Sequence, residues 1–337
     1  GWYEEWSRVY GGDGHSQFAQ PIGDTDEDGD NEIIVGGYEA SPAWGRARIL
    51  SYNATLGTYA EEYNWYVLGG TYHCPSGCCV LDLDGNGDLE FVVSWAHSGS
   101  DGIYAYDWDG KTLALLDRYL CGLTFDVYAC DYDGDKQTEV LVANDPQGGT
   151  PWHVGAFGWV EGKFVVEATW RLGTYTWECP MVWSGDIKGE GRNDIVACIS
   201  DGSSATAGTW ALHWNSILRQ WEEEFVYASL IGGGTHYGVV AGDINGNGIA
   251  EIGIGNNVPG YIGAAAALVE WDGTKYRKVW EGNWPSEYAI IEAVAIGDAD
   301  NDRKNEFCAG GGNIHVVGWT GTEYAEKSKI TETAGLL

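Results

Sequence analysis

Basic side chains are scarce in this sequence of 337 residues. Lys and Arg number 18 against 50 Asp and Glu, which gives a formal net charge of −32. Nucleic acids and anionic membrane surfaces would repel such a chain, so we expect neither as a partner. The apolar runs fall short of the roughly 18 residues that a membrane-spanning helix needs, so we expect no membrane insertion either.

Several sequence signals of known chemistry are also lacking. The chain has no Gly-x-Ser-x-Gly, Walker or dinucleotide-binding motif, and no paired Cys-x-x-Cys motifs at zinc-finger spacing. Long helical periodicity is missing too, which favours an all-β fold. With 18 Trp, 20 Tyr and 44% hydrophobic residues, the chain nevertheless has enough apolar surface for a large core, which argues against disorder.

One motif recurs six times along the chain. Each copy places an aspartate-rich turn before an apolar run, and the copies begin at Asp24, Asp82, Asp131, Asp186, Asp243 and Asp298. The intervals are 58, 49, 55, 57 and 55 residues. This period is typical of one four-stranded blade of a β-propeller.

Apolar runs on both sides of each turn supply the strands of a blade. One strand enters the turn, as in "YGVVAGD", and a second leaves it, as in "EVLVAN". A third strand ends in an aromatic hairpin such as "LVEWDGTKY", and a fourth, amphipathic strand such as "KFVVEATWRL" follows. The sequence therefore predicts residues 1–337 as a single six-bladed propeller, with an acidic loop between the first two strands of each blade.

The two termini offer one strand too many for this plan. Residues 1–12 have the pattern of a fourth strand and would close the last blade, but residues 323–331 compete for the same place. Residues 323–337 are then an extra edge strand or a tail. Alternatively, one terminal strand adds to a neighbouring molecule, and the protein assembles with itself.

The acidic loops have the pattern of calcium sites. Carboxylates at positions 1, 3, 5 and 9, with a backbone carbonyl at position 7, can surround one hard cation with oxygens, which suits calcium. A single copy would fit a solvated turn equally well, but six copies in register favour the metal. The motif D-x-D-x-D-G-x-x-E before a strand, at this period, resembles the FG-GAP/VCBS-type repeats of integrin alpha propellers, fungal propeller lectins and propeller polysaccharide lyases.

Carried over position by position, the resemblance implies about five calcium sites that brace the hairpins. The implied ligands are Asp24, Asp26, Asp28 and Glu32; Asp82, Asp84, Asn86 and Glu90; Asp131, Asp133, Asp135 and Glu139; Asp243, Asn245, Asn247 and Glu251; and Asp298, Asp300, Asp302 and Glu306. The third and sixth loops depart from the motif, because Lys136 and Arg303 stand where it has a turn glycine.

The fourth loop, Asp186 to Asp194, departs from the motif in another way. Lys188 stands at position 3, where the motif has a carboxylate. We expect its ammonium to pair with Asp186, Glu190 or Asp194 and to do part of the work of the ion. The fourth loop should then fold like the others with weak calcium or none.

In the resembling propellers, the loops of the opposite face surround the channel mouth, and here they are rich in aromatic and His residues. Exposed rings stack on the apolar face of a sugar, so these loops favour a carbohydrate or glycoprotein ligand. The predicted ligand-binding residues are His15, Trp44, Trp95, His97, Trp152, His153, Trp177 and Trp284. A second set recurs at one place in the third-strand hairpin and is predicted to pack within the blades: Tyr52, Trp108, Trp159, Trp214, Trp271 and Trp319.

Two other functions compete with a carbohydrate-binding module. The first is a self-assembling extracellular structural protein that uses a terminal strand. The second is a polysaccharide lyase, in which Tyr72, His73, His236 and Tyr237 would supply acid and base for β-elimination. A lyase must neutralise the carboxylate of its substrate, and these loops carry few basic residues. We therefore expect a binding protein rather than an enzyme.

Eight Cys and one sequon favour a secreted, extracellular protein with a glycan on Asn53. Cys74, Cys78, Cys121 and Cys179 fall in or beside loops that disulfides would hold, although the pairing does not follow from the sequence. Three others fall in predicted strands and are expected to be buried thiols: Cys130, Cys198 and Cys308.

Overall fold

The computed structural model describes residues 15–26, 28–40, 43–66, 74–96, 101–147, 150–173, 179–200, 208–227, 235–257, 264–285, 287, 291 and 293–331. The chain divides into two compact units. Unit 1 comprises Gly1–Cys130 and Lys136–Arg171, and unit 2 comprises Asp131–Asp135 and Leu172–Leu337. Within the described ranges, all regular elements are β-strands, and no helix is long and apolar enough to cross a membrane.

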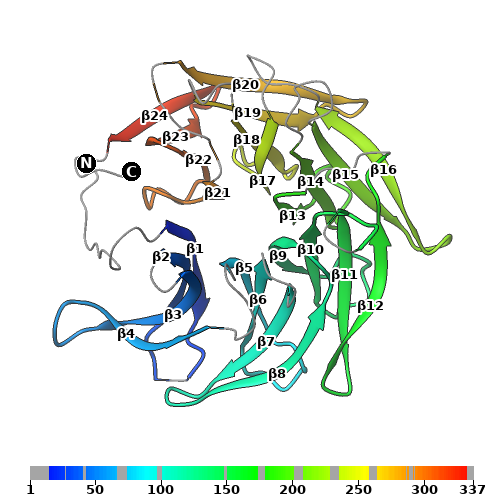
Figure 1. Ribbon diagram of the computed structural model, residues 1–337. Coiled ribbons are helices and arrows are strands. Elements are labelled where there is room, and N and C mark those ends of the chain that lie inside the picture. Colours follow the sequence, from blue (N-terminus) through cyan, green and yellow to red (C-terminus); the bar gives the residue numbers. More distant parts are fainter. Residues whose placement is uncertain are drawn as a thin grey trace. The chain divides into compact units, whose positions relative to one another are not determined.

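Unit 1 holds three four-stranded antiparallel sheets, each with its strands in chain order (Figure 1). The first sheet contains β1 (His15–Gly23), β2 (Glu32–Ala40), β3 (Ala43–Asn53) and β4 (Thr58–Trp65). The second contains β5 (Cys74–Leu81), β6 (Glu90–Ala96), β7 (Gly102–Trp108) and β8 (Leu113–Leu120). The third contains β9 (Thr124–Cys130), β10 (Glu139–Asn144), β11 (Val154–Val160) and β12 (Lys163–Trp170).

Unit 2 holds three more sheets of the same construction. The fourth sheet contains β13 (Val182–Gly185), β14 (Asp194–Ile199), β15 (Gly208–Asn215) and β16 (Gln220–Tyr227). The fifth contains β17 (Thr235–Gly242), β18 (Glu251–Asn257), β19 (Ala264–Trp271) and β20 (Tyr276–Trp284). The sixth contains β21 (Ala293–Gly297), β22 (Glu306–Gly310), β23 (Asn313–Trp319) and β24 (Tyr324–Thr331). The four-strand grammar predicted from the repeats is confirmed in all six sheets.

Burial differs between the strands of a sheet in the way that the sequence pattern indicates. The second strands β6 and β10 are buried along their whole length, which explains their continuous apolar runs. The fourth strands β8 and β12 alternate between more and less exposed side chains, as expected for one covered face and one solvated face. Each sheet is therefore covered on both faces near its second strand and open to solvent along its fourth.

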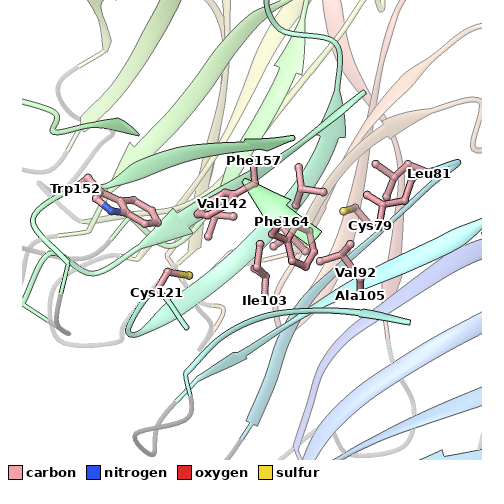
Figure 2. Packing of buried hydrophobic residues seen from close by; sticks show 13 residues of the cluster. Cys79, Leu81, Val92, Ile103, Ala105, Cys121, Val142, Trp152, Phe157 and Phe164 are labelled. Carbon is pink, nitrogen blue, oxygen red and sulfur yellow. The ribbon is translucent and has the colours of Figure 1, made fainter. Parts of the chain in front are cut away.

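A core cluster in unit 1 shows how neighbouring sheets pack. The ring of Phe157 lies 5.0 Å from that of Tyr119 and 6.1 Å from that of Trp152. Figure 2 shows Phe157 and Phe164 among aliphatic side chains that include Val142. These side chains come from the second and third sheets, so the two sheets share one hydrophobic core.

The hairpin between the third and fourth strands carries an aromatic pair in most sheets. The paired residues stand opposite each other with ring centroids 4.8 to 5.9 Å apart: Tyr52 and Tyr59, Trp159 and Phe164, Trp214 and Trp221, Trp271 and Tyr276, Trp319 and Tyr324. In the second sheet, Trp108 stands opposite Leu113. Such cross-strand pairs stabilise the hairpin, which agrees with the packing role predicted for the Trp rings, whereas Tyr52 is 42% exposed.

The C-terminal strand occupies a regular place in unit 2. β24 pairs with β23 and forms the fourth strand of the sixth sheet (Figure 1). Residues 323–331, which the sequence left as an extra strand or a tail, thus complete a sheet. The competing segment 1–12 lies outside the described residues, and its role stays a prediction.

Candidate functional site

Each acidic loop ends on a buried carboxylate at the first residue of the next strand. We number the loops in chain order: loop one (24–32), loop two (82–90), loop three (131–139), loop four (186–194), loop five (243–251) and loop six (298–306). Their last residues are at most 3% exposed: Glu32, Glu90, Glu139, Asp194, Glu251 and Glu306. A carboxylate buried to this degree needs donors or a cation to compensate the loss of water.

One oxygen of this terminal glutamate holds the loop. In four loops, Oε2 accepts the backbone N–H of the residue seven positions earlier, at 2.7 to 3.0 Å: Thr25, Leu83, Ile244 and Ala299. The other oxygen, Oε1, is left for a second partner, and that partner differs from loop to loop.

The first aspartate of each loop shapes the turn. Its carboxylate accepts the backbone N–H of position 6 at 2.8 to 3.1 Å in five loops, at Gly29, Gly87, Gly191, Gly248 and Arg303. Position 6 has a positive φ, which favours glycine. Lys136 and Arg303 adopt it as well, with φ of 75° and 68°. The two departures from the motif thus keep the same turn, at a strain of about 1 kcal/mol each.

Loops one and two gather carboxylates that contact no basic side chain within the described part of the chain. Their clustered oxygens lie within 4.8 Å of one another: Asp24, Asp26 and Glu32 in loop one, and Asp82, Asp84 and Glu90 in loop two. In loop one, Asp24 Oδ1 and Glu32 Oε1 are buried and accept no hydrogen bond. Hard oxygen donors in this arrangement fit calcium.

Burial raises the pKa of the terminal glutamate in three loops, and in loop five it raises the pKa of Glu251 to about 7 although Asn245 donates to this glutamate. Burial raises the pKa of Glu32 to about 7, and the carboxylate of Asp26 adds to the shift. Burial likewise raises the pKa of Glu90 to about 6, with a contribution from Asp84. A cation among these oxygens would favour the ionised forms and reverse both shifts.

Loop five satisfies its buried glutamate with an amide. Asn245 Nδ2 donates to Glu251 Oε1 at 2.7 Å and lies 2.7 Å from the Tyr324 hydroxyl oxygen. Asp243 and Glu251 are the only carboxylates in this loop, so it offers fewer charges to a metal than loops one and two. The amide occupies the oxygen that would face an ion.

Loop six satisfies its glutamate with a lysine from a distant strand. Lys327 on β24 places Nζ 2.8 Å from Glu306 Oε1, 2.9 Å from Asp300 and 3.4 Å from Asp302. These hydrogen bonds raise the pKa of Lys327 and, through Lys327, lower that of Asp300. The ammonium therefore stands among three of the four predicted calcium ligands. The sequence pattern does not reveal this contact of Lys327, because it assigns residues 323–337 to a surplus strand or a tail.

Loop four corrects the predicted pairing of Lys188. Its Nζ donates to Glu224 on β16 at 2.6 Å and lies 4.6 Å above the ring of Trp271. His213 then links Glu224, at 3.1 Å, to the buried Asp194, at 2.8 Å. The lysine thus reaches past its own loop, because β16 offers a carboxylate and β19 of the next sheet offers an aromatic face.

The carboxylates expected to receive Lys188 have other partners. Asp186 accepts the backbone N–H groups of Glu190 and Gly191, each at 2.8 Å. Glu190 forms an ion pair with Arg192 at 2.9 Å. Loop four is therefore held by hydrogen bonds of its own chain, although Asp194 Oδ2 is buried without one. The expectation of weak calcium or none stays a prediction.

Loop three divides between the two units, with Asp131, Asp133 and Asp135 in unit 2 and Glu139 in unit 1. The turn resembles the others, since Asp131 accepts the backbone N–H of Gly134 at 2.7 Å. The calcium set predicted for loop three stays a prediction.

Several predicted ligand-binding residues are not on a surface. Trp95 and His153 are completely buried, and Trp152 is 8% exposed. Trp284 stacks on His315 with ring centroids 3.6 Å apart and is half-buried. Burial of Trp95, Trp152 and His153 corrects the expectation that they are exposed to a sugar, whereas the role of Trp284 stays a prediction. The side chains of the remaining candidates lie outside the description: His15, Trp44, His97 and Trp177.

One of the catalytic residues proposed for a lyase is buried as well. His236 is completely buried, its Nδ1 lies 2.8 Å from the Thr209 hydroxyl, and burial lowers its pKa to about 4. A neutral, enclosed imidazole does not meet a polysaccharide, which corrects the expected placing of His236 at a channel mouth. Tyr237 is half-buried, and Tyr72 and His73 lie outside the described residues.

Three of the four cysteines expected in disulfides are free thiols. Cys78 and Cys121 are buried and unbridged, and burial raises the pKa of Cys121 to about 12. The Cys179 thiol donates to the Met181 carbonyl oxygen at 3.6 Å. Cys130 and Cys198 are buried as predicted and Cys308 is partly so, while the side chain of Cys74 lies outside the description. No disulfide was found between the described thiols.

Comparison with known proteins supports the fold. No family model and no curated protein sequence matches this chain. Among solved structures, Sqt1 from Chaetomium thermophilum is 13% identical with a TM-score of 0.56, over 94% of this chain and 71% of that one. A Lactobacillus plantarum protein is 14% identical with a TM-score of 0.60, over 90% and 82%. The Dos1 propeller is 10% identical with a TM-score of 0.53, over 90% and 82%.

These likenesses define the class of protein. The chain is an all-β, six-bladed β-propeller in which each four-stranded sheet is one blade. At such low identity the likenesses show the fold alone. Membership of the FG-GAP/VCBS-type family stays a prediction.

The buried His236 should make stability depend on pH. An unfolded His takes up a proton near pH 6.5, while folded His236 does so only near pH 4. The unfolded state therefore binds more protons between these values, and stability should fall by roughly 3 kcal/mol as pH drops from 6.5 to 4. Urea unfolding of His236→Asn should not show this fall in the free energy of unfolding. For each protein, the value at every pH is compared with the value of the same protein at pH 7. Equal pH slopes in the two proteins would contradict the assignment.

Removing the lysine of loop six should turn this loop into a calcium-dependent one. Lys327→Gln leaves Asp300, Asp302 and Glu306 without their ammonium, so we expect a loss of about 1 kcal/mol in calcium-free buffer. Added calcium should restore the loss, and calorimetric titration should detect one more bound ion than in the wild type. Lys304→Gln removes the same charge from an exposed side chain of the loop and is the control. A Lys327 variant that binds no more calcium than this control would refute the prediction.

Proposed function

We propose that this chain is a calcium-stabilised recognition module, secreted and directed at carbohydrates or glycosylated surfaces. The observation that carries the calcium part is the pair of orphaned buried oxygens in loop one, Asp24 Oδ1 and Glu32 Oε1, beside the carboxylate of Asp26. Three negative groups in one buried turn need a positive charge, and no basic side chain contacts them among the described residues.

The calcium sites we propose are fewer than the motif implies. Asp24, Asp26 and Glu32 would hold an ion in loop one, and Asp82, Asp84 and Glu90 in loop two. In loops four, five and six, groups of the chain itself already contact the buried carboxylate. Calcium would neutralise charge and brace the hairpin, and it would take no part in a reaction.

Carbohydrate is the ligand class that the aromatic residues in the loop sequences favour. The net charge of −32 disfavours acidic polysaccharides, which leaves neutral or basic glycans. Asn53 lies at the exposed turn between β3 and β4, where its Oδ1 accepts the backbone N–H of Leu56. A sequon in an exposed turn is accessible for glycosylation, which is consistent with a secreted protein.

Calcium removal should lower the melting temperature. If loops one and two each bind calcium at about a hundred times its Kd, the ions stabilise the fold by about 5 kcal/mol together, or roughly 10 °C. Thermal unfolding in excess EDTA should show this loss, and Glu32→Gln, which keeps the hydrogen bond to Thr25, should lose about half of it. Asp88→Asn, at an exposed position of loop two, is the control. An unchanged melt in EDTA would overturn the calcium proposal.

A glycan array tests the recognition part. Fluorescently labelled protein in calcium buffer should bind neutral or basic glycans and leave sulfated and uronate-rich ones unbound. Heat-denatured protein is the control for adsorption. Binding to no glycan on the array would refute carbohydrate recognition. The calcium proposal does not depend on this result.

A further inference from the structure

A cavity of about 290 Å³ lies wholly within unit 2. Its wall is formed by the first residues of loop three, by loop four and by the hairpin between β15 and β16. This volume stands at the lower end of the range for small-molecule sites, about 300 Å³ and above, so it suits a ligand the size of one sugar ring. None of the ligand-binding residues predicted from the sequence lines it.

One wall of the cavity is a rigid aromatic group. Trp214 meets Tyr132 edge-to-face at 5.1 Å, and Trp221 lies 5.9 Å from Trp214. Tyr132 and Trp221 stack at 4.9 Å, which closes the group. Because its neighbours hold Trp214 in place, a ligand would lose little side-chain entropy in packing on the half-buried indole.

The other walls are acidic. Asp131, Asp133 and Asp186 line the cavity, and Arg192 is the basic residue among its lining residues. Arg192 is already compensated, since it pairs with Glu190 at 2.9 Å. The cavity thus keeps an excess of negative charge and favours a positively charged ligand.

Hydrogen-bonding groups complete the wall. Arg192 Nη1 donates to the Trp214 carbonyl oxygen at 3.1 Å, which fixes the guanidinium beside the ring. Asn193 Nδ2 lies 3.4 Å from the Asp131 carbonyl oxygen, so the amide is oriented with Oδ1 as its acceptor. Donors and acceptors around an aromatic face are what the hydroxyls of a sugar require.

We propose that this cavity binds an amino sugar, a hexopyranose with a free ammonium group, as a unit of a basic glycan. The ring packs on Trp214 and the ammonium lies against the carboxylates of Asp133 and Asp186. This assignment rests on the proposed carbohydrate recognition and names its ligand class. A uronic acid would meet like charge in this cavity, a neutral sugar would leave its excess of negative charge unbalanced, and a bare metal ion would make no use of the indole.

Calorimetric titration with matched oligosaccharides tests the assignment. A β-1,4-linked glucosamine tetramer should bind at least tenfold more tightly than its fully N-acetylated counterpart, because acetylation removes the charge and keeps the ring. The titration is run at low, fixed calcium, since an ion on Asp131 and Asp133 would compete with the ammonium. Asp186→Asn should weaken the glucosamine tetramer about tenfold, and Trp214→Ala should weaken it by a similar factor.

The control variant is Asp298→Asn, which changes the same position of loop six and should leave glucosamine binding unchanged. Equal affinity for the two tetramers, or no effect of Asp186→Asn, would overturn the assignment. So would tighter binding of a tetralysine peptide, which would point to a basic protein segment instead. If the glucosamine tetramer fails while neutral glycans bind on the array, the cavity assignment falls and carbohydrate recognition stands.

Discussion

The structure depends on a buried carboxylate that begins the second strand of each blade. In four loops one of its oxygens ties down the backbone of the preceding loop, at 2.7 Å from Thr25 in loop one and at 3.0 Å from Ala299 in loop six. The bond fixes the hairpin, but it leaves a second oxygen buried beside other acids. Each loop therefore needs a donor or a cation at the same place.

The blades meet this need by different chemistry. Loop six uses the ammonium of Lys327, and loop five uses the amide of Asn245. In loop four, His213 lies between the carboxylates of Asp194 and Glu224, and Glu224 pairs with Lys188. Loop one has two buried oxygens without a hydrogen bond, Asp24 Oδ1 and Glu32 Oε1, and loop four also keeps one, Asp194 Oδ2. A repeat that looks uniform in sequence thus separates into loops that the chain neutralises itself and loops for which we propose an ion.

The fold was predictable because its signals are local. The aspartate spacing set the period, and the apolar runs of β6 and β10 and the alternation of β8 and β12 identified the strands. Contacts between a loop and the fourth strand of the same blade have no such local signal. Lys327 lies 21 residues beyond Glu306 on a strand with no assigned place, and nothing local to Lys188 points to Glu224. Trp95 and Trp152 were expected on a surface because Trp near a loop suits both a sugar site and a core.

The most direct test of the account is anomalous diffraction from crystals grown with calcium. The account predicts anomalous peaks among the carboxylates of loops one and two, and none beside Lys188 or Lys327. Peaks of equal height in all six loops would show that the chain's own cations do not replace the ion. Empty density in loops one and two would show that the buried acids are compensated in some other way.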